Sequence, residues 1–406
     1  MQKYNSSTRL ALCGGSPAAQ IEAGISRNFY AEEAQILRVL RSGVWGGYSD
    51  AVREFESRFG DYIGEAHCIT VANGTVSLEV ALRCEGIGPG DEVIVPPYTF
   101  VATAAAVLQV GAVPVFVDIE RDTLNIDSKC FESAITPRTR AVIPVHFGGH
   151  AADMDPILAI ARAHGLVVIE DAAHAHGGEY KGQRLGGIGD WGSFSFQQSK
   201  IMTSGEGGCL ITRDQQRARA ARSYCNQGRI PGGAWYDHHT LGTNLRLTGF
   251  QAAILLAQFE QLDERIVTRN ANAAALRSAM LEMPAVKPLL PMSYCTRHAL
   301  ALFLFRYNQH EAGVSKSLFE AALKAEGIPV METYPRPLYG NPMFTKWPSR
   351  NTGCPVAERS CAEIVTLPFS LLNAGATAIE QTLGAMQKVL GNLDQLQNAG
   401  VNKAAG

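Results

Sequence analysis

Six short runs rich in β-branched and other apolar residues alternate with helix-forming stretches in the first half of the chain. These strand-like runs lie at residues 68–72, 92–96, 113–118, 141–146, 166–171 and 209–212. Apolar residues at helical spacing separate several of them, at residues 75–84, 100–109 and 153–164. Strands that are apolar on both faces and alternate with helices form a mostly parallel sheet covered by helices on both sides. The sequence therefore predicts an α/β fold.

The sequence on either side of this alternation predicts further helices and a second, smaller unit. An irregular arm precedes two helices at 28–40 and 49–58, and one long helix, broken at most once, is expected at 248–281. Beyond it, a strand at 300–307 and helices at 315–326 and 376–396 indicate an α+β unit. We therefore expect four segments: an N-terminal arm with helices of the large domain (1–65), the large domain (66–247), a long connecting helix (248–285) and a small C-terminal domain (286–406).

Composition excludes several classes of partner. The formal net charge of −2 over 406 residues offers no basic surface for nucleic acid or for an acidic membrane. No apolar run reaches membrane-spanning length, and the first ten residues lack the apolar core of a secretion signal. The nine cysteines show no C-x-x-C or Cys/His ligand spacing, so we expect reduced thiols in the cytoplasm and no metal site.

A lysine and an aspartate each follow a strand-like run. The run from residue 166 ends in Asp171, and Lys200 follows the strand-like residues 193–196 and precedes a Gly-rich stretch. Taken alone, such a lysine is usually solvated, and such an aspartate often caps the next helix. Together, an amine that can condense with an aldehyde and a carboxylate that can hold a pyridinium are the two parts that pyridoxal phosphate (PLP) requires. The pair predicts amine chemistry with PLP as the cofactor and with Lys200 and Asp171 as catalytic residues.

A cradle for the phosphate of PLP is expected where a strand, a glycine turn and a helix start follow one another at residues 71–78. The free amides of Gly74 and Thr75, the Thr75 hydroxyl and the helix dipole all favour an anion. Any α/β protein has several such turns, so the turn alone is weak evidence. Ser195 and Gln197, on the strand before Lys200, can add hydroxyl and amide contacts.

Two further side chains are candidates to contact the ring of PLP. Phe100 lies at the mouth of another strand and can stack on the pyridine, although core packing is the commoner fate of such a residue. His174 can lie over the ring or form a hydrogen bond to its phenolic oxygen, and His176 is the alternative candidate for this contact. The alternative for His174 is an ordinary helix-terminal residue.

The chain as a whole resembles the DegT/StrS-type sugar aminotransferases, which are fold-type I PLP enzymes. The resemblance runs nearly end to end, and so long an ordered set of motifs is highly specific. The shared motifs are Trp45-Gly-Gly47, Ala72-Asn-Gly-Thr75, Thr99-Phe-Val-Ala-Thr103, Glu170-Asp-Ala-Ala173, Phe194-Ser-Phe196 with Lys200, Gly205-Glu-Gly-Gly208, Gly242-Thr-Asn-Leu-Arg246, Gln251-Ala-Ala253, and Tyr334 with Pro337-Leu338. The resemblance implies a large PLP-binding domain with its sheet sandwiched by helices, followed by a smaller domain.

The resemblance also implies roles for the matching residues. Lys200 would bind the cofactor covalently, and Asp171 would face the pyridine nitrogen. The other cofactor contacts would come from Gly74, Thr75, Phe100, His174, Ser195, Gln197 and Asn244. Asn244 matches the position that reaches the phosphate of the neighbouring subunit, so the site would be shared within a homodimer. The substrate would meet Tyr334, Tyr339 and Arg246.

Three positions depart from the common family pattern. Gln197 stands where many members carry His, which resembles the branch that acts on keto-cyclitols, including the glutamine:scyllo-inosose aminotransferases and relatives that make 3-amino-5-hydroxybenzoate. Tyr339 and Phe369 stand where His is frequent and where substrate contacts are expected. The family's dehydratase branch replaces the lysine by His, so the presence of Lys200 favours transamination.

The expected activity is therefore transfer of an amino group from glutamine or glutamate to a ketone on a sugar or cyclitol. Three alternatives stay open at this point: a nucleotide-linked keto-sugar as the acceptor, a PLP-binding regulator that does not turn over, and an α/β binding module without PLP.

Overall fold

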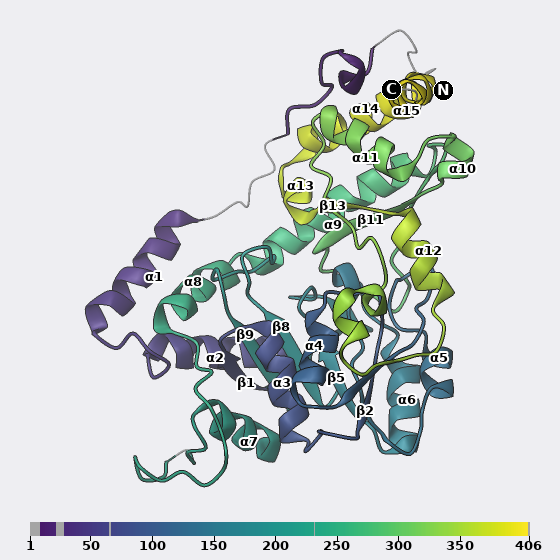
Figure 1. Ribbon diagram of the computed structural model, residues 1–406. Helices are drawn as coiled ribbons and strands as arrows, with labels where there is room; N and C mark the ends of the chain where they lie inside the picture. Colours follow the sequence, from purple (N-terminus) through teal and green to yellow (C-terminus); the bar gives the residue numbers. More distant parts are fainter. Residues whose placement is uncertain (1–8, 22–27, 65, 231, 405–406) are drawn as a thin grey trace.

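The computed structural model describes residues 9–21, 28–64, 66–230 and 232–404 (Figure 1). An eight-stranded sheet runs through the larger part of the molecule in the order β1-β9-β8-β5-β4-β2-β3-β12. Only β9 is antiparallel to its neighbours β1 and β8, and the other neighbouring strands are parallel. The strands are β1 (His67–Val71), β2 (Glu92–Val95), β3 (Val113–Phe116), β4 (Thr139–Val142), β5 (Val167–Asp171), β8 (Trp191–Ser195), β9 (Gly208–Thr212) and β12 (Arg350–Asn351). The mostly parallel sheet predicted from the sequence is confirmed.

Alternating side chains of the strands feed two apolar clusters, one on each face of the sheet. In β2, Val93 and Val95 pack into one cluster and Ile94 into the other, because successive residues of a strand point to opposite faces. The face of Ile94 is covered by α2 (Asp50–Gly64), α5 (Ser128–Ser133), α6 (Met154–His164) and α8 (Gly249–Phe259). The opposite face is covered by α3 (Gly74–Cys84), α4 (Ala102–Gln109), α7 (Gln215–Cys225) and α12 (Pro355–Glu363). This double burial explains why the strands are apolar throughout.

A smaller unit is built around an antiparallel sheet in the order β10-β11-β13 (Figure 1, top). Its strands are β10 (Val286–Pro288), β11 (Leu302–Tyr307) and β13 (Ile364–Pro368). A third apolar cluster joins β11 and β13 to the end of α9 (Leu262–Met280), to α11 (Lys316–Ala325), α13 (Phe369–Asn373) and α14 (Ala376–Leu390). The remaining elements are α1 (Phe29–Ser42), which packs on α8, α10 (Gln309–Ala312), α15 (Leu393–Ala404), the hairpin β6 (Glu179–Tyr180) and β7 (Gln183–Arg184), and 3-10 turns at Ala11–Cys13, Phe147–Gly149, Leu338–Gly340 and Pro342–Thr345.

Two helix predictions can be compared directly with the structure. The long helix expected at 248–281 is broken once, between α8 and α9, as predicted. The single terminal helix expected at 376–396 is wrong, because α14 ends before Gly391 and α15 starts at Leu393. Asn392 sits at this break, buried, with its side chain donating to the Lys388 carbonyl at 2.8 Å. That bond gives the chain a local alternative to continued helix.

The packing of two segments differs from the four expected parts. Leu10 and Ala19, in the expected arm, lie in the third apolar cluster with the C-terminal unit. Strand β12, from the expected C-terminal domain, pairs with β3 and adds the last strand to the large sheet. The division into domains stays a prediction. In the described part of the chain, no helix combines the length and the apolar character needed to cross a membrane.

Candidate active site

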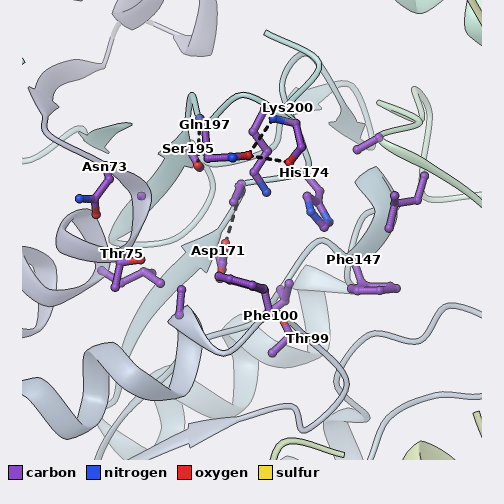
Figure 2. Close-up of a pocket in the computed structure, with 18 of the residues that line it drawn as sticks. Asn73, Thr75, Thr99, Phe100, Phe147, Asp171, His174, Ser195, Gln197 and Lys200 are labelled. Atoms are coloured by element: carbon purple, nitrogen blue, oxygen red, sulfur yellow. Dashed lines mark hydrogen bonds between the residues drawn. The ribbon is translucent and has the colours of Figure 1, made fainter. Parts of the chain in front are cut away.

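A cavity of about 780 Å³ opens at the carboxyl ends of β5 and β8 (Figure 2). Its walls come from the start of α3, the loop before α4, the turn after β5, the turn after β8 and segments of the C-terminal unit near residues 301–302, 331–334 and 366. In open α/β sheets, ligands bind outside the carboxyl ends of the strands. The fold therefore places this cavity where an active site is expected.

Lys200 lies in the turn that follows β8, and its side chain lines this cavity. Its backbone amide donates to the Gln197 carbonyl at 2.9 Å, which closes the turn. Burial lowers the pKa of the Lys200 amine from an ordinary 10.5 to about 8, while the Asp171 carboxylate acts in the opposite direction. An amine with this pKa is available in its neutral, nucleophilic form near neutral pH.

Asp171 ends β5 and is 6% exposed within the same cavity. Both of its carboxylate oxygens are held: Oδ2 accepts a hydrogen bond from the Thr103 hydroxyl at 2.8 Å, and Oδ1 accepts one from the Ala173 amide at 3.2 Å. The backbone of Asp171 bonds to that of Pro144 and His146, which fixes the strand end. The carboxylate is therefore oriented by its surroundings and faces the cavity that Lys200 also lines.

The residues predicted to hold the phosphate come together at the start of α3. The Asn73 side chain accepts from the Val76 amide at 3.0 Å, while the amides of Gly74 and Thr75 belong to the first turn, where a helix offers no internal acceptor. Ser195 faces this turn from the end of β8, and a Cβ atom at position 74 would lie 2.7 Å from the Ser195 Cβ. Only glycine lets α3 come this close. Gly74, Thr75 and Ser195 all line the cavity.

Gln197 also lines the cavity, from the turn that carries Lys200. Its side-chain oxygen accepts from the Ser199 amide at 2.8 Å and the Ser199 hydroxyl at 2.7 Å. With the oxygen engaged in the turn, the amide nitrogen of Gln197 is the group that can donate to a bound molecule.

The structure places only one of the two candidate histidines, His174, in the lining of the cavity. His174 lines the cavity beside the Phe147 ring, with 5.9 Å between ring centroids, and its Nδ1 is buried without a hydrogen-bond partner among the described residues (Figure 2). Burial, and then the Lys200 charge, hold the pKa of His174 well below its ordinary 6.5. His176 is instead buried outside the cavity lining, against Phe194 and Phe196.

Phe100 differs from an ordinary core phenylalanine. It lines the cavity, yet 59% of it is exposed. An exposed aromatic face above a cavity suits a planar ligand that stacks on it. Four features of the cavity fit PLP. They are the exposed ring of Phe100, the unpaired Nδ1 of His174, the amides at the start of α3 and the lowered pKa of Lys200. When PLP is bound, Gly74, Thr75 and Ser195 would hold its phosphate.

Four residues expected at the site do not line this cavity, and one of them, Phe369, is buried in the apolar cluster that contains Ile94. Tyr339 packs on Phe116 and its hydroxyl donates to Glu358 at 2.7 Å, so the structure does not bring it to the expected substrate site. Arg246 donates to Asn226 at 2.7 Å in a second hollow of about 490 Å³. Asn244 is exposed and its backbone also bridges to Asn226. Of the predicted substrate contacts, only Tyr334 lines the cavity of Lys200.

Several lining residues were not predicted from the sequence. Phe147, Glu332, Thr333 and Thr366 line the cavity, and Thr103 supports Asp171 from just behind it. Thr103 lay inside a motif noted in the sequence, which could have pointed to it. Glu332 and Thr366 belong to separate segments of the C-terminal unit, and no local pattern marks them.

Comparisons with known proteins show which proteins this chain is similar to. A relative in Streptoalloteichus tenebrarius, provisionally named L-glutamine:3-amino-2,3-dideoxy-scyllo-inosose aminotransferase, is 40% identical over 96% of this chain and 100% of its own. The UDP-2-acetamido-2-deoxy-3-oxo-D-glucuronate aminotransferase of Pseudomonas aeruginosa is 37% identical over 83% of this chain and 90% of its own. The crystal structure of 3-amino-5-hydroxybenzoic acid synthase is similar with a TM-score of 0.85 and 32% identity, covering 91% of this chain and 98% of that one.

The model of the DegT/DnrJ/EryC1/StrS aminotransferase family matches residues 29–379, which is most of the chain. Proteins of this family depend on PLP, and the cavity that holds Lys200 and Asp171 fits that cofactor. The chain therefore belongs to the DegT/DnrJ/EryC1/StrS aminotransferase family and is a PLP-dependent aminotransferase.

Proposed function

We propose that this enzyme transfers an amino group from glutamine or glutamate to a ketone on a cyclitol or sugar ring, with a free cyclitol as the preferred acceptor. One observation carries the proposal: Lys200, with a pKa of about 8, and the buried Asp171 line one cavity together with the start of α3. That combination is suited to amine transfer.

The residues of the cavity have distinct roles in this proposal. When bound, PLP supplies an electron-withdrawing ring that stabilises negative charge on a neighbouring carbon. Asp171 would bind the pyridine nitrogen, and Lys200 would bind the aldehyde carbon. Once released, the Lys200 Nζ would accept the proton from the donor's α-carbon, a general-base contribution of about 10²–10⁴-fold. Burial raises the pKa of the Tyr334 phenol well above its usual range, so this residue would act as a hydrogen-bond donor.

The charge of the cavity supports an acceptor without phosphate. Among the described lining residues, Lys200 is the only Lys or Arg, while Glu79, Glu206 and Glu332 add carboxylates to that of Asp171. The wall from the C-terminal unit adds hydroxyls of Thr333, Tyr334 and Thr366. Carboxylates and hydroxyls suit the hydroxyl groups of a cyclitol, whereas a diphosphate needs cations or free amides. The provisional name of the Streptoalloteichus relative, which acts on an amino-inosose, supports the same acceptor.

A nucleotide-linked keto-sugar is the second candidate acceptor. The Pseudomonas relative carries such an activity in its name. The second hollow is lined by several arginines, among them Arg53, Arg222, Arg229 and Arg246, and guanidinium groups attract phosphates.

We further propose that the enzyme works as a homodimer in the cytoplasm. Asn244 does not line its own subunit's cavity, and the segment before it exposes Trp235, Tyr236 and Leu241 by 77%, 77% and 92%. Large exposed apolar side chains of this kind often mark an interface, so Asn244 would complete the partner's site. All nine cysteines are free thiols, which supports a reducing compartment.

The test is to load the enzyme with pyridoxamine phosphate and offer a panel of keto-cyclitols and nucleotide-linked keto-sugars. Recovery of the visible absorbance of bound PLP with a free keto-cyclitol is expected. Recovery only with nucleotide-linked sugars would overturn the preferred acceptor. A spectral change without release of a keto acid from glutamine or glutamate would instead indicate a regulator. A colourless protein whose absorbance does not change when PLP is added would indicate a binding module.

A further inference from the structure

Two threonines behind Asp171 have no part in the mechanism described so far. Thr103 is fully buried in the first turn of α4, and its hydroxyl lies 2.8 Å from the Asp171 Oδ2. Thr99 is 3% exposed, lines the cavity, and its hydroxyl lies 3.3 Å from that of Thr103. The three side chains form a short chain that leads from the cavity wall to the carboxylate.

Elementary chemistry fixes the direction of these hydrogen bonds. An ionised carboxylate can only accept, and each hydroxyl has a single proton to donate. Thr103 therefore donates to Asp171, which leaves only its lone pairs for Thr99. It follows that Thr99 donates to Thr103, which in turn donates to Asp171.

This arrangement fixes the orientation of the carboxylate as well as its charge. The Thr103 hydroxyl holds Oδ2 from one side, and the Ala173 amide holds Oδ1 from the other at 3.2 Å. With both oxygens held, rotation of the carboxylate breaks at least one bond. Buried hydrogen bonds to a charged group are stronger than those between neutral groups and are costly to leave unmade.

We infer that Thr103 is a positioning residue for transamination, and that Thr99 supports it through the Thr103 hydroxyl. Thr103 acts on the cofactor only through Asp171, by holding the carboxylate in the orientation that binds the pyridine nitrogen. The inference rests on the proposed function, because the orientation of Asp171 matters to the reaction only when that nitrogen faces it.

The experiment compares four variants of the full-length holoenzyme. Thr103→Val removes the hydroxyl with almost no change of volume, and Thr103→Ser keeps the hydroxyl and should restore function. Thr99→Val removes only the supporting donor. Thr212→Val is the matched control: Thr212 is 3% exposed and donates to the Asp190 carbonyl at 2.9 Å, at the far end of β9 and outside the cavity lining.

In Thr103→Val, we expect kcat to fall about 10- to 100-fold, the range that loss of a hydrogen bond to a charged group gives, with a much smaller change in KM. The visible absorption of bound PLP, recorded without substrate, should shift in position or intensity. Thr99→Val should show a smaller effect in the same direction, and Thr103→Ser should approach the wild type.

The inference is overturned if Thr103→Val keeps the wild-type kcat and spectrum, or if Thr103→Ser is as impaired as Thr103→Val. It is also overturned if Thr212→Val loses as much kcat, because the loss would then reflect a buried hydroxyl in general. Measurements on the wild-type enzyme distinguish failure of this inference from failure of the proposed function. Wild-type protein without a PLP spectrum or amino transfer would contradict the proposed function, whatever the variants do.

Discussion

Lys200 and His174 line the same cavity, and burial makes both side chains less basic. The pKa of the lysine falls to about 8, and that of the histidine falls well below 6.5. At neutral pH, the imidazole is therefore uncharged, and the amine is poised between its two forms. Desolvation opposes the charged form of both groups. Among the described residues that line the cavity, Lys200 therefore carries the nitrogen that titrates closest to neutral pH.

The first prediction concerns this titration. The rate at which apoenzyme binds PLP covalently should rise with pH and level off above about 8, because only the neutral amine attacks the aldehyde. Stopped-flow absorbance over a pH series measures it. An inflection close to 10.5, the ordinary lysine value, would contradict the burial argument. Lys324→Ala, at an exposed position of α11, should leave the inflection unchanged.

Removing Lys200 or Asp171, the two proposed catalytic residues, should give different defects. Lys200→Ala should abolish both turnover and the visible absorbance of covalently bound PLP, because no amine remains to attach the cofactor. Asp171→Ala should keep that absorbance but lose roughly 100-fold or more in rate, since the ring is no longer held as an electron sink. Spectra and keto-acid release measure the two effects. Full activity in either variant would remove that residue from the mechanism.

Glu332 permits a test of the acceptor. Its carboxylate lines the cavity wall contributed by the C-terminal unit. If it accepts hydrogen bonds from the acceptor ring, Glu332→Gln should raise KM for a keto-cyclitol about 5- to 50-fold with little change in kcat. Steady-state kinetics with varied acceptor measure this, with Glu380→Gln on the exposed side of α14 as control. An unchanged KM would place the acceptor elsewhere.

At the scale of elements, the site depends on how closely α3 approaches β8. Gly74 starts α3 against Ser195, and this contact places the amides of the helix start beside the end of β8, an arrangement that suits an anion. Nothing about the helix alone requires glycine at its first position. The requirement comes from the neighbouring strand.

Gly74→Ala should therefore weaken cofactor binding and lower stability, because a Cβ 2.7 Å from the Ser195 Cβ forces the two elements apart. We expect a loss of about 1–3 kcal/mol in unfolding free energy, measured by denaturation of the apoenzyme, and a raised Kd for PLP. Gly384→Ala is the control: this exposed glycine within α14 has open space around it, and alanine there should stabilise by about 0.5–1 kcal/mol. If Gly74→Ala is as stable as the wild-type protein, α3 and β8 can move apart without a measurable loss of stability.

At the scale of the whole molecule, residues brought to the site from the C-terminal unit close the cavity, and a partner subunit is proposed to complete it. Asn244 lies away from its own subunit's cavity, which is where a residue that serves the neighbouring site would lie. Because a symmetric dimer shares each interface contact twice, subunit mixing can test this role.

Asn244→Ala and Lys200→Ala homodimers should each be nearly inactive. Mixed and refolded together, they should regain about a quarter of wild-type activity, because half of the dimers would be mixed and each would contain one intact site. Keto-acid release from the mixture measures the recovery. Activity no greater than the sum of the separate variants would show that Asn244 does not serve the partner's site.

The sequence by itself determined the alternating architecture, because strands buried on both faces and helices buried on one have different apolar spacing. It also marked Lys200, Asp171, Gly74 and Ser195, since these lie at strand ends and helix starts, where local pattern and backbone geometry coincide. The structure brings these residues to one cavity.

Only the tertiary structure decided which of two neighbouring histidines lines the cavity, that Tyr339 does not, and that Glu332 does. It also revealed the Thr103 bond to Asp171, across 68 residues of sequence. These outcomes depend on contacts between segments far apart in the chain. The local spacing of residues does not determine which distant segment a side chain will contact. These contacts are therefore known only from the folded structure.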